Sequence, residues 1–135
     1  MSDPIGEIRG MSPELKAKFE VEGIKNTQQL LEHAHTEHQR TELAHKMGST
    51  AHVIKELVNR ADLMRLKGVG TVFSNLLEDA GVNSCKEMQH RKPDHLHKTL
   101  EEYHTQHKLA NRAPTLNEVT EWVAEAKKLA ASSPE

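Results

Sequence analysis

One stretch of the sequence carries the clearest structural signal: Leu63-Met64-Arg65-Leu66-Lys67-Gly68-Val69-Gly70-Thr71-Val72-Phe73-Ser74-Asn75-Leu76-Leu77. Apolar residues recur at spacings of three and four on both sides of the two glycines, which predicts two short helices joined by a tight turn. A turn this short needs the backbone freedom of glycine. Val69, between the glycines, is expected to pack down between the two helices.

The same turn has the chemistry of an anion site. Backbone N–H groups of the turn, together with the free N–H groups that open the second helix, are expected to point outward. The two basic residues before the turn add positive charge, two hydroxyl side chains follow it, and the stretch contains no acid. We therefore assign phosphate binding to Arg65, Lys67, Gly68, Val69, Gly70, Thr71 and Ser74.

This pattern resembles the helix-hairpin-helix motif. In proteins with that motif the bound anion is usually a nucleic-acid phosphate, and such contacts position a protein without reading bases. The resemblance implies non-sequence-specific binding of DNA, with RNA as a second nucleic acid to consider. The leading function predicted from the sequence is weak DNA binding by a non-enzymatic protein.

An internal repeat relates the two halves of the chain. A shift of 58 positions pairs Gly10 with Gly68 and Gly23 with Gly81, and it aligns apolar residues and helix starts over the same region. We expect an all-α fold of two helix-hairpin-helix repeats, each of about five short helices, packed as one compact body. Residues 1–60 would form a degenerate repeat, 61–131 the repeat with the intact glycine hairpin, and 132–135 a frayed tail.

Helix starts are predicted by polar capping residues ahead of apolar runs. Two of these capping residues, Ser84 and Thr115, are followed three positions later by Glu, which is the spacing of a capping box. Asp62 is expected to lead the short helix before the glycine turn. The other predicted starts are Asp3-Pro4, Ser12-Pro13, Asn26, Thr36 or its neighbours, Ser49-Thr50, Thr71, Ser84, Pro93 and Thr115.

The first copy of the hairpin departs from the pattern. It reads Gly10-Met11-Ser12-Pro13-Glu14, with serine in place of the second glycine. Pro13 removes a backbone donor, and the carboxylate of Glu14 would repel a phosphate. We expect this copy to be structural.

Beyond the hairpin, nearly the whole chain is similar to a bacterial family of tandem helix-hairpin-helix proteins, domain of unknown function 4332. The resemblance is closest from Asn59 to Leu129. It is carried by Asn59-Arg60-Ala61-Asp62-Leu63-Met64-Arg65-Leu66-Lys67-Gly68-Val69-Gly70, Leu76-Leu77-Glu78-x-Ala80-Gly81-Val82, Lys108-Leu109-x-x-Arg112-x-Pro114 and Val119-x-x-Trp122-Val123-x-x-Ala126-Lys127. The resemblance implies the fold and no activity.

Charge counts against strong DNA binding. The chain of 135 residues has a formal net charge of −2, with 8 Lys and Arg against 9 Asp and Glu in 1–61 and 10 against 11 in 62–135. A protein that binds duplex DNA through charge alone is normally basic. The competing prediction is a protein-interaction module or adaptor built on the same scaffold.

Other features of the sequence narrow the range of possible functions and cellular locations. The single cysteine, Cys85, cannot form an internal disulfide and is expected to be a buried thiol, and the start of the chain resembles no signal peptide. No stretch approaches the length of a membrane span, so we expect a cytoplasmic protein with no membrane partner.

Ten histidines raise the question of a metal, and His97, Glu101 and His104 share one face of a predicted helix. No established metal-binding spacing appears, so we expect no metal and no cofactor. No phosphate loop, nucleophile elbow or paired-carboxylate motif is present either. The prediction is no enzyme and no small-molecule substrate.

Overall fold

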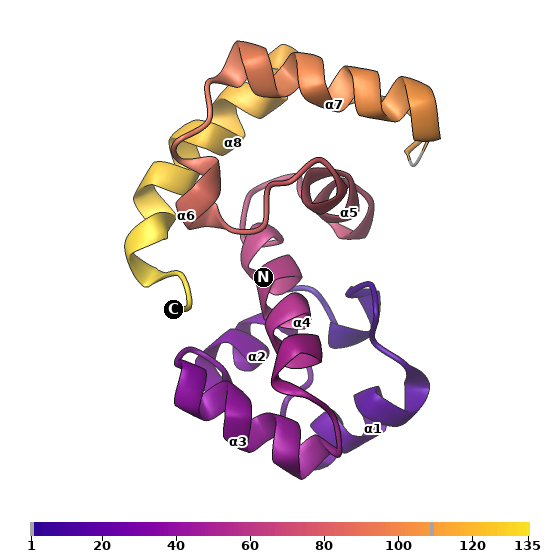
Figure 1. The fold of residues 1–135 in the computed structure, drawn as a ribbon, viewed down its shortest axis with the longest axis vertical. Coiled ribbons are helices and arrows are strands. Elements are labelled where there is room, and N and C mark those ends of the chain that lie inside the picture. The colour runs from indigo at the N-terminus through magenta and orange to yellow at the C-terminus, as the bar shows by residue number, and fades with distance from the viewer. Residues whose placement is uncertain (1, 109) are drawn as a thin grey trace.

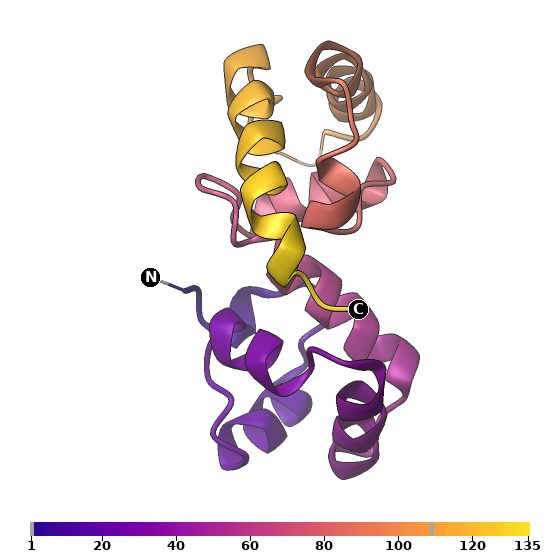
Figure 2. The same cartoon turned by 90° about the vertical axis from the view of Figure 1, so that its left-hand side faces the viewer.

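The computed structural model describes residues 2–108 and 110–135, and these residues form helices only (Figures 1 and 2). Leu109, which belongs to the family-like pattern, and Met1 lie outside the described residues. The all-α fold class is confirmed. The elements are η1 (Ile5–Glu7), α1 (Pro13–Val21), α2 (Thr27–His33), α3 (Glu37–Met47), α4 (Ala51–Leu63), α5 (Thr71–Asp79), α6 (Cys85–Met88), α7 (Pro93–His107), α8 (Leu116–Leu129) and η2 (Ala130–Ser132).

Most helices begin where the sequence predicts a cap. In each case the capping oxygen accepts a hydrogen bond from the backbone N–H three residues later, which satisfies one donor that the first turn leaves free. Thr36 and Thr115 form full capping boxes with Gln39 and Glu118. The other capping side chains are Ser12, Asn26, Thr50 and Ser84.

Buried apolar side chains form two clusters, which we call the N-terminal core and the C-terminal core. The N-terminal core runs from Ile5 to Met64 and the C-terminal core from Leu63 to Ala126. Helix α4 is shared between them, because Ile54 and Leu57 lie in the first cluster and Leu63 in the second. Figure 1 shows α4 running along the axis that joins the two halves of the molecule.

Asp62 does not open a new helix. It lies near the end of α4, which continues without a break to Leu63, so the boundary expected after residue 60 falls inside a helix. The carboxylate of Asp62 instead accepts a hydrogen bond from the N–H of Cys85, at 2.9 Å, where α6 begins. The prediction that Asp62 caps the start of a helix is wrong, because its carboxylate binds Cys85, which lies far away in the sequence.

The same backbone hydrogen bonds and backbone conformations occur within each half of the chain, at positions that differ by 58. The left-handed backbone of Gly10, with φ of 93°, matches that of Gly68, with φ of 85°. The bond from Ile8 N–H to Ile5 O corresponds to the bond from Leu66 N–H to Leu63 O. In the same way, the bond from Met11 N–H to Ile8 O corresponds to the bond from Val69 N–H to Leu66 O. The interpretation of the chain as two diverged copies stays a prediction, and these matched bonds support it.

The final residues are held in place, in contrast to the frayed tail expected from the sequence. Ser133 is 3% exposed and donates its hydroxyl hydrogen to the carboxylate of Asp62. In Figure 2 the yellow end of the chain passes from α8 to a position beside α4. The polar composition of this segment suggested fraying. The sequence pattern did not show what holds the segment, because its partners are distant in the sequence. Over the described residues, no helix combines the length and apolarity that crossing a membrane requires.

Candidate nucleic-acid interface

The glycine turn joins the end of α4 to the start of α5. Gly68 takes the left-handed conformation, with φ of 85°, and Val69 is buried, as expected, with its N–H bonded to the carbonyl of Leu66 at 3.0 Å. Gly70 is extended and occupies the capping position of α5. A Cβ atom at Gly70 would meet nothing within 4 Å, so the backbone here is open to an approaching group.

Helix α5 begins without a side-chain cap and without an acid in its first turn. In the described part of the chain, the N–H groups of Gly70, Thr71, Val72 and Phe73 donate to no protein atom. Helix α7 also lacks a side-chain cap, but Pro93 removes a donor there and Asp94 adds negative charge. The start of α5 is therefore a set of free donors at the positive end of a helix dipole.

Lys67 supplies a free positive charge beside these donors. Its side chain is exposed and, over residues 2–108 and 110–135, belongs to no ion pair. Its backbone is held by α8: the N–H donates to the carboxylate of Glu125 at 2.8 Å, and the carbonyl accepts from the indole of Trp122 at 3.1 Å. The carboxylate of Glu125 also places one negative charge close to the turn.

Three of the side chains expected to bind phosphate are engaged within the protein. Arg65 donates to Asp62 at 2.8 Å and to Ser132 at 2.6 Å. Ser74 is 1% exposed and donates to the carbonyl of Thr71 at 2.9 Å, while the Thr71 hydroxyl donates to the carbonyl of Glu7 at 2.8 Å. The N–H of Val69, also expected to bind phosphate, is bonded to Leu66. The Lys67 ammonium and the N–H groups from Gly70 to Phe73 remain available to a ligand in the described part of the chain.

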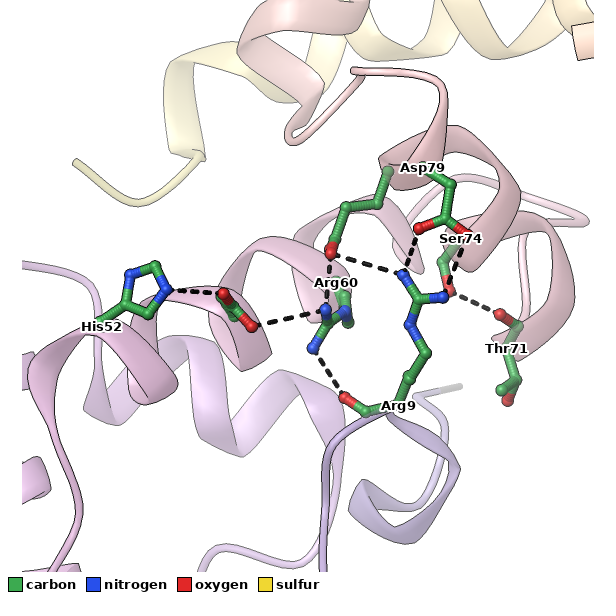
Figure 3. A network of polar contacts seen from close by, with 8 residues as sticks. Arg9, His52, Arg60, Thr71, Ser74 and Asp79 are labelled. Atoms are coloured by element: carbon green, nitrogen blue, oxygen red, sulfur yellow. Dashed lines mark hydrogen bonds and ion pairs between the residues drawn. The ribbon is translucent and has the colours of Figure 1, made fainter. Parts of the chain in front are cut away.

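A network of charged side chains fixes α5 against the N-terminal half (Figure 3). Arg9 donates to both carboxylate oxygens of Asp79, at 3.1 and 2.7 Å. Arg60 donates to Glu78 at 2.6 Å and to the carbonyl of Arg9 at 2.8 Å. Because the helix is held at its far end by this network and near its start by Thr71, the direction of its free N–H groups is fixed.

Arg112 is a further basic group near the turn that the sequence did not single out as a site residue. Its guanidinium carbon lies 5.4 Å from the centre of the Phe73 ring, over its face, and its nitrogens donate to both carboxylate oxygens of Glu118, at 2.7 and 3.1 Å. The hydrogen bonds from Arg112 lower the pKa of Glu118 to about 2. The family-like pattern contains Arg112, but no spacing rule links it to Phe73.

The remaining titratable candidates do not form a reactive site with the turn. Cys85 is buried, as predicted, and burial raises the pKa of its thiol to about 12, so the reactive thiolate is scarce at neutral pH. Across the residues that the structure describes, no three His, Cys, Asp or Glu side chains lie together as metal ligands would.

Together, the fold and the turn define a small all-helical protein with an open helix N-terminus at a Gly-Val-Gly turn. Residues 9–129 match the family model described as Domain of unknown function (DUF4332). The match covers most of the chain, so the chain belongs to this family. No curated protein and no solved structure matches it.

Proposed function

We propose that the protein binds nucleic-acid phosphates weakly, without sequence specificity, through the turn between α4 and α5. The observation that carries this proposal is the open start of α5, where four consecutive N–H groups have no acceptor among the residues that the structure describes and Gly70 leaves room for an anion. A phosphate oxygen would accept from these N–H groups at the positive end of the helix dipole. Such a contact reads no base.

Binding should be weak because few charges take part. Within the described residues Lys67 forms no ion pair, whereas Arg65 is paired with Asp62 and Arg112 with Glu118. The formal net charge of −2 gives no long-range attraction to DNA. Because phosphate contacts release counterions, the affinity should still fall as salt rises, but the dependence should be shallow because few charges take part.

The second candidate is a protein-interaction module or adaptor. The engagement of Arg65, Thr71 and Ser74 favours it, because these groups serve the fold and not a ligand. The balanced charge favours it as well.

Fluorescence anisotropy with labelled duplex and single-stranded DNA, across a salt series, separates the two candidates. We expect micromolar affinity at low salt that weakens on adding salt. Lys67→Glu should weaken binding by about tenfold or more, since it replaces an attraction with a repulsion. Lys128→Glu makes the same charge change on an exposed face of α8 and serves as the control. No binding at low salt would refute the nucleic-acid proposal.

Gly70→Asp is a second variant that separates binding from folding. An Asp side chain at this capping position would accept hydrogen bonds from the N–H groups of α5 and fill the anion site with its own carboxylate. We expect DNA binding to be lost while stability is unchanged or rises by a few tenths of a kcal/mol. Retained binding would mean that the start of α5 is not the contact.

A further inference from the structure

The end of the described chain is bound on the N-terminal half as a ligand would be. Figures 1 and 2 show the yellow terminal segment leaving α8 and reaching the junction with the N-terminal half. Glu135 is contacted there at its backbone and at its side chain. Its N–H donates to the carbonyl of His35 at 3.0 Å, and its side-chain carboxylate accepts from the N–H of Glu37 at 3.2 Å, in the first turn of α3.

Two cationic side chains form hydrogen bonds with the main-chain oxygen of Glu135. Arg40 and Lys55 both donate to that oxygen of Glu135. A third cation, Lys86, donates to the carbonyl of Pro134 at 3.4 Å. The segment from Ser133 to Glu135 therefore lies among three cations and one helix N-terminus.

The receiving surface combines Arg40 and Lys55 of the N-terminal half with Lys86 of α6, and contacts outside the segment hold Arg40 in place. With the segment in place Arg40 is 5% exposed, and its guanidinium also donates to the carbonyls of Ala34 and His35 at 3.1 and 3.0 Å, which fixes its position. In the described chain, neither Arg40 nor Lys55 forms an ion pair with an Asp or Glu side chain. A buried cation without a carboxylate partner is costly, which favours an acidic occupant.

We infer that Arg40, Lys55, Lys86 and the start of α3 form a binding site for an extended acidic peptide segment, which residues 133–135 occupy in cis. The site accepts a Glu residue through its N–H, its main-chain oxygen and its carboxylate together. This site goes beyond the proposed nucleic-acid contact and uses no residue of the glycine turn. A covalently attached segment competes at an effective concentration in the millimolar range, so a peptide from a partner must displace it.

The test is peptide binding in trans after the segment in cis has been weakened. Glu135→Lys removes the carboxylate from the start of α3 and places a cation near Arg40 and Lys55. A labelled peptide, Leu-Ala-Ala-Ser-Ser-Pro-Glu capped at both ends, is titrated by anisotropy against this variant and the unchanged chain. We expect the variant to bind at least tenfold more tightly, and a peptide ending in Lys not to bind it.

Matched variants assign the binding to the surface. Adding Lys55→Gln to Glu135→Lys should abolish peptide binding, whereas adding Lys46→Gln, an exposed change on α3, should leave it unchanged. Equal affinity of Glu135→Lys and the unchanged chain, or equal affinity for the Glu and Lys peptides, would overturn the inference. If Glu135→Lys fails to fold, the unchanged chain is titrated with millimolar peptide by NMR. A shift of the Glu37 amide resonance would then support the site, and no shift would overturn it.

Discussion

Gly68 and Gly70 lie two positions apart and are glycines for different physical reasons. Gly68 has φ of 85°, a conformation that other L-amino acids rarely adopt, although a Cβ there would make only an ordinary contact with the Trp122 indole at 3.8 Å. Gly70 has φ of −103°, which any residue adopts, and open space around its Cα. The first glycine is required by the turn, and the second keeps the start of α5 accessible.

Alanine at each glycine separates these two roles. We expect Gly68→Ala to lower the free energy of unfolding by about 1–2 kcal/mol, because the left-handed backbone strains any side chain. Gly70→Ala should change it by no more than about 0.5 kcal/mol in either direction, since the backbone is already extended. Urea unfolding of both variants measures the difference. Equal losses would show that the sign of φ is not what decides these positions.

The pair of Arg112 and Glu118 gives a pH prediction. Hydrogen bonds from Arg112, with help from the N–H of Thr115, lower the folded-state pKa of Glu118 to about 2, below the ordinary value of about 4.3. A lowered folded-state pKa means that the pair contributes stability above pH 4.3, which is lost as the pH falls toward 2. The contribution is small because the Arg112 side chain is 57% exposed, so solvent screens the pair.

An NMR titration of the Glu118 carboxyl resonance tests this assignment. The midpoint should lie near pH 2 in the unchanged chain and rise in Arg112→Gln, while staying below the ordinary value because Thr115 still donates at 2.9 Å. An unchanged midpoint in Arg112→Gln would remove Arg112 as the cause.

At the scale of elements, α5 depends on charged contacts with the N-terminal half more than on apolar packing there. Glu78 and Asp79, at its end, bind Arg60 and Arg9, and Thr71, at its start, binds the carbonyl of Glu7. The side chain of Arg60 is 9% exposed and that of Glu78 is 18% exposed. Without Arg60, the Glu78 carboxylate would keep only its longer contact with Arg9, at 3.6 Å, in a largely buried place.

Arg60→Leu should therefore lower the free energy of unfolding by about 2–3 kcal/mol, because Glu78 keeps its charge in a half-buried place. Adding Glu78→Leu should recover part of that loss, since it removes a carboxylate that has lost its closer partner. The pair of Arg91 and Glu87, at 2.6 Å and with side chains 36% and 37% exposed, is the control, and Arg91→Leu should cost less than about 1 kcal/mol. Urea unfolding of the four proteins provides the comparison, and equal costs for the two arginines would contradict a buried role for Arg60.

The sequence predicted the elements well where the cause is local. Capping residues such as Asn26 and Thr115 lie within four residues of the groups they bind, so their pattern is visible in one dimension. Asp62 resembles a cap, but its carboxylate binds Cys85, Arg65 and Ser133, and two of these lie far along the chain. The engagement of side chains at the turn could not be predicted for the same reason, because a sequence shows that Arg65 is basic and not what it contacts.

At the scale of the whole molecule, the two cores share a helix and a set of polar ties. Helix α4 contributes Leu57 to the N-terminal core and Leu63 to the C-terminal core. The segment from Ser133 to Glu135 returns from the C-terminal half to Arg40 and Lys55. Unfolding one half would take away one end of α4 and release these contacts, so each half stabilises the other.

This coupling predicts a single unfolding transition. Trp122, the only tryptophan in the chain, lies in the C-terminal core, so its fluorescence reports that half, whereas far-ultraviolet circular dichroism reports helices of both. The two signals should give the same urea midpoint.

Asp62→Ala removes the acceptor of Cys85, Arg65 and Ser133 and should lower the free energy of unfolding by about 3 kcal/mol, shifting both midpoints together by about 1.5 M urea. If only the fluorescence midpoint moved, the halves would be independent units, and α4 and the terminal segment would not couple them.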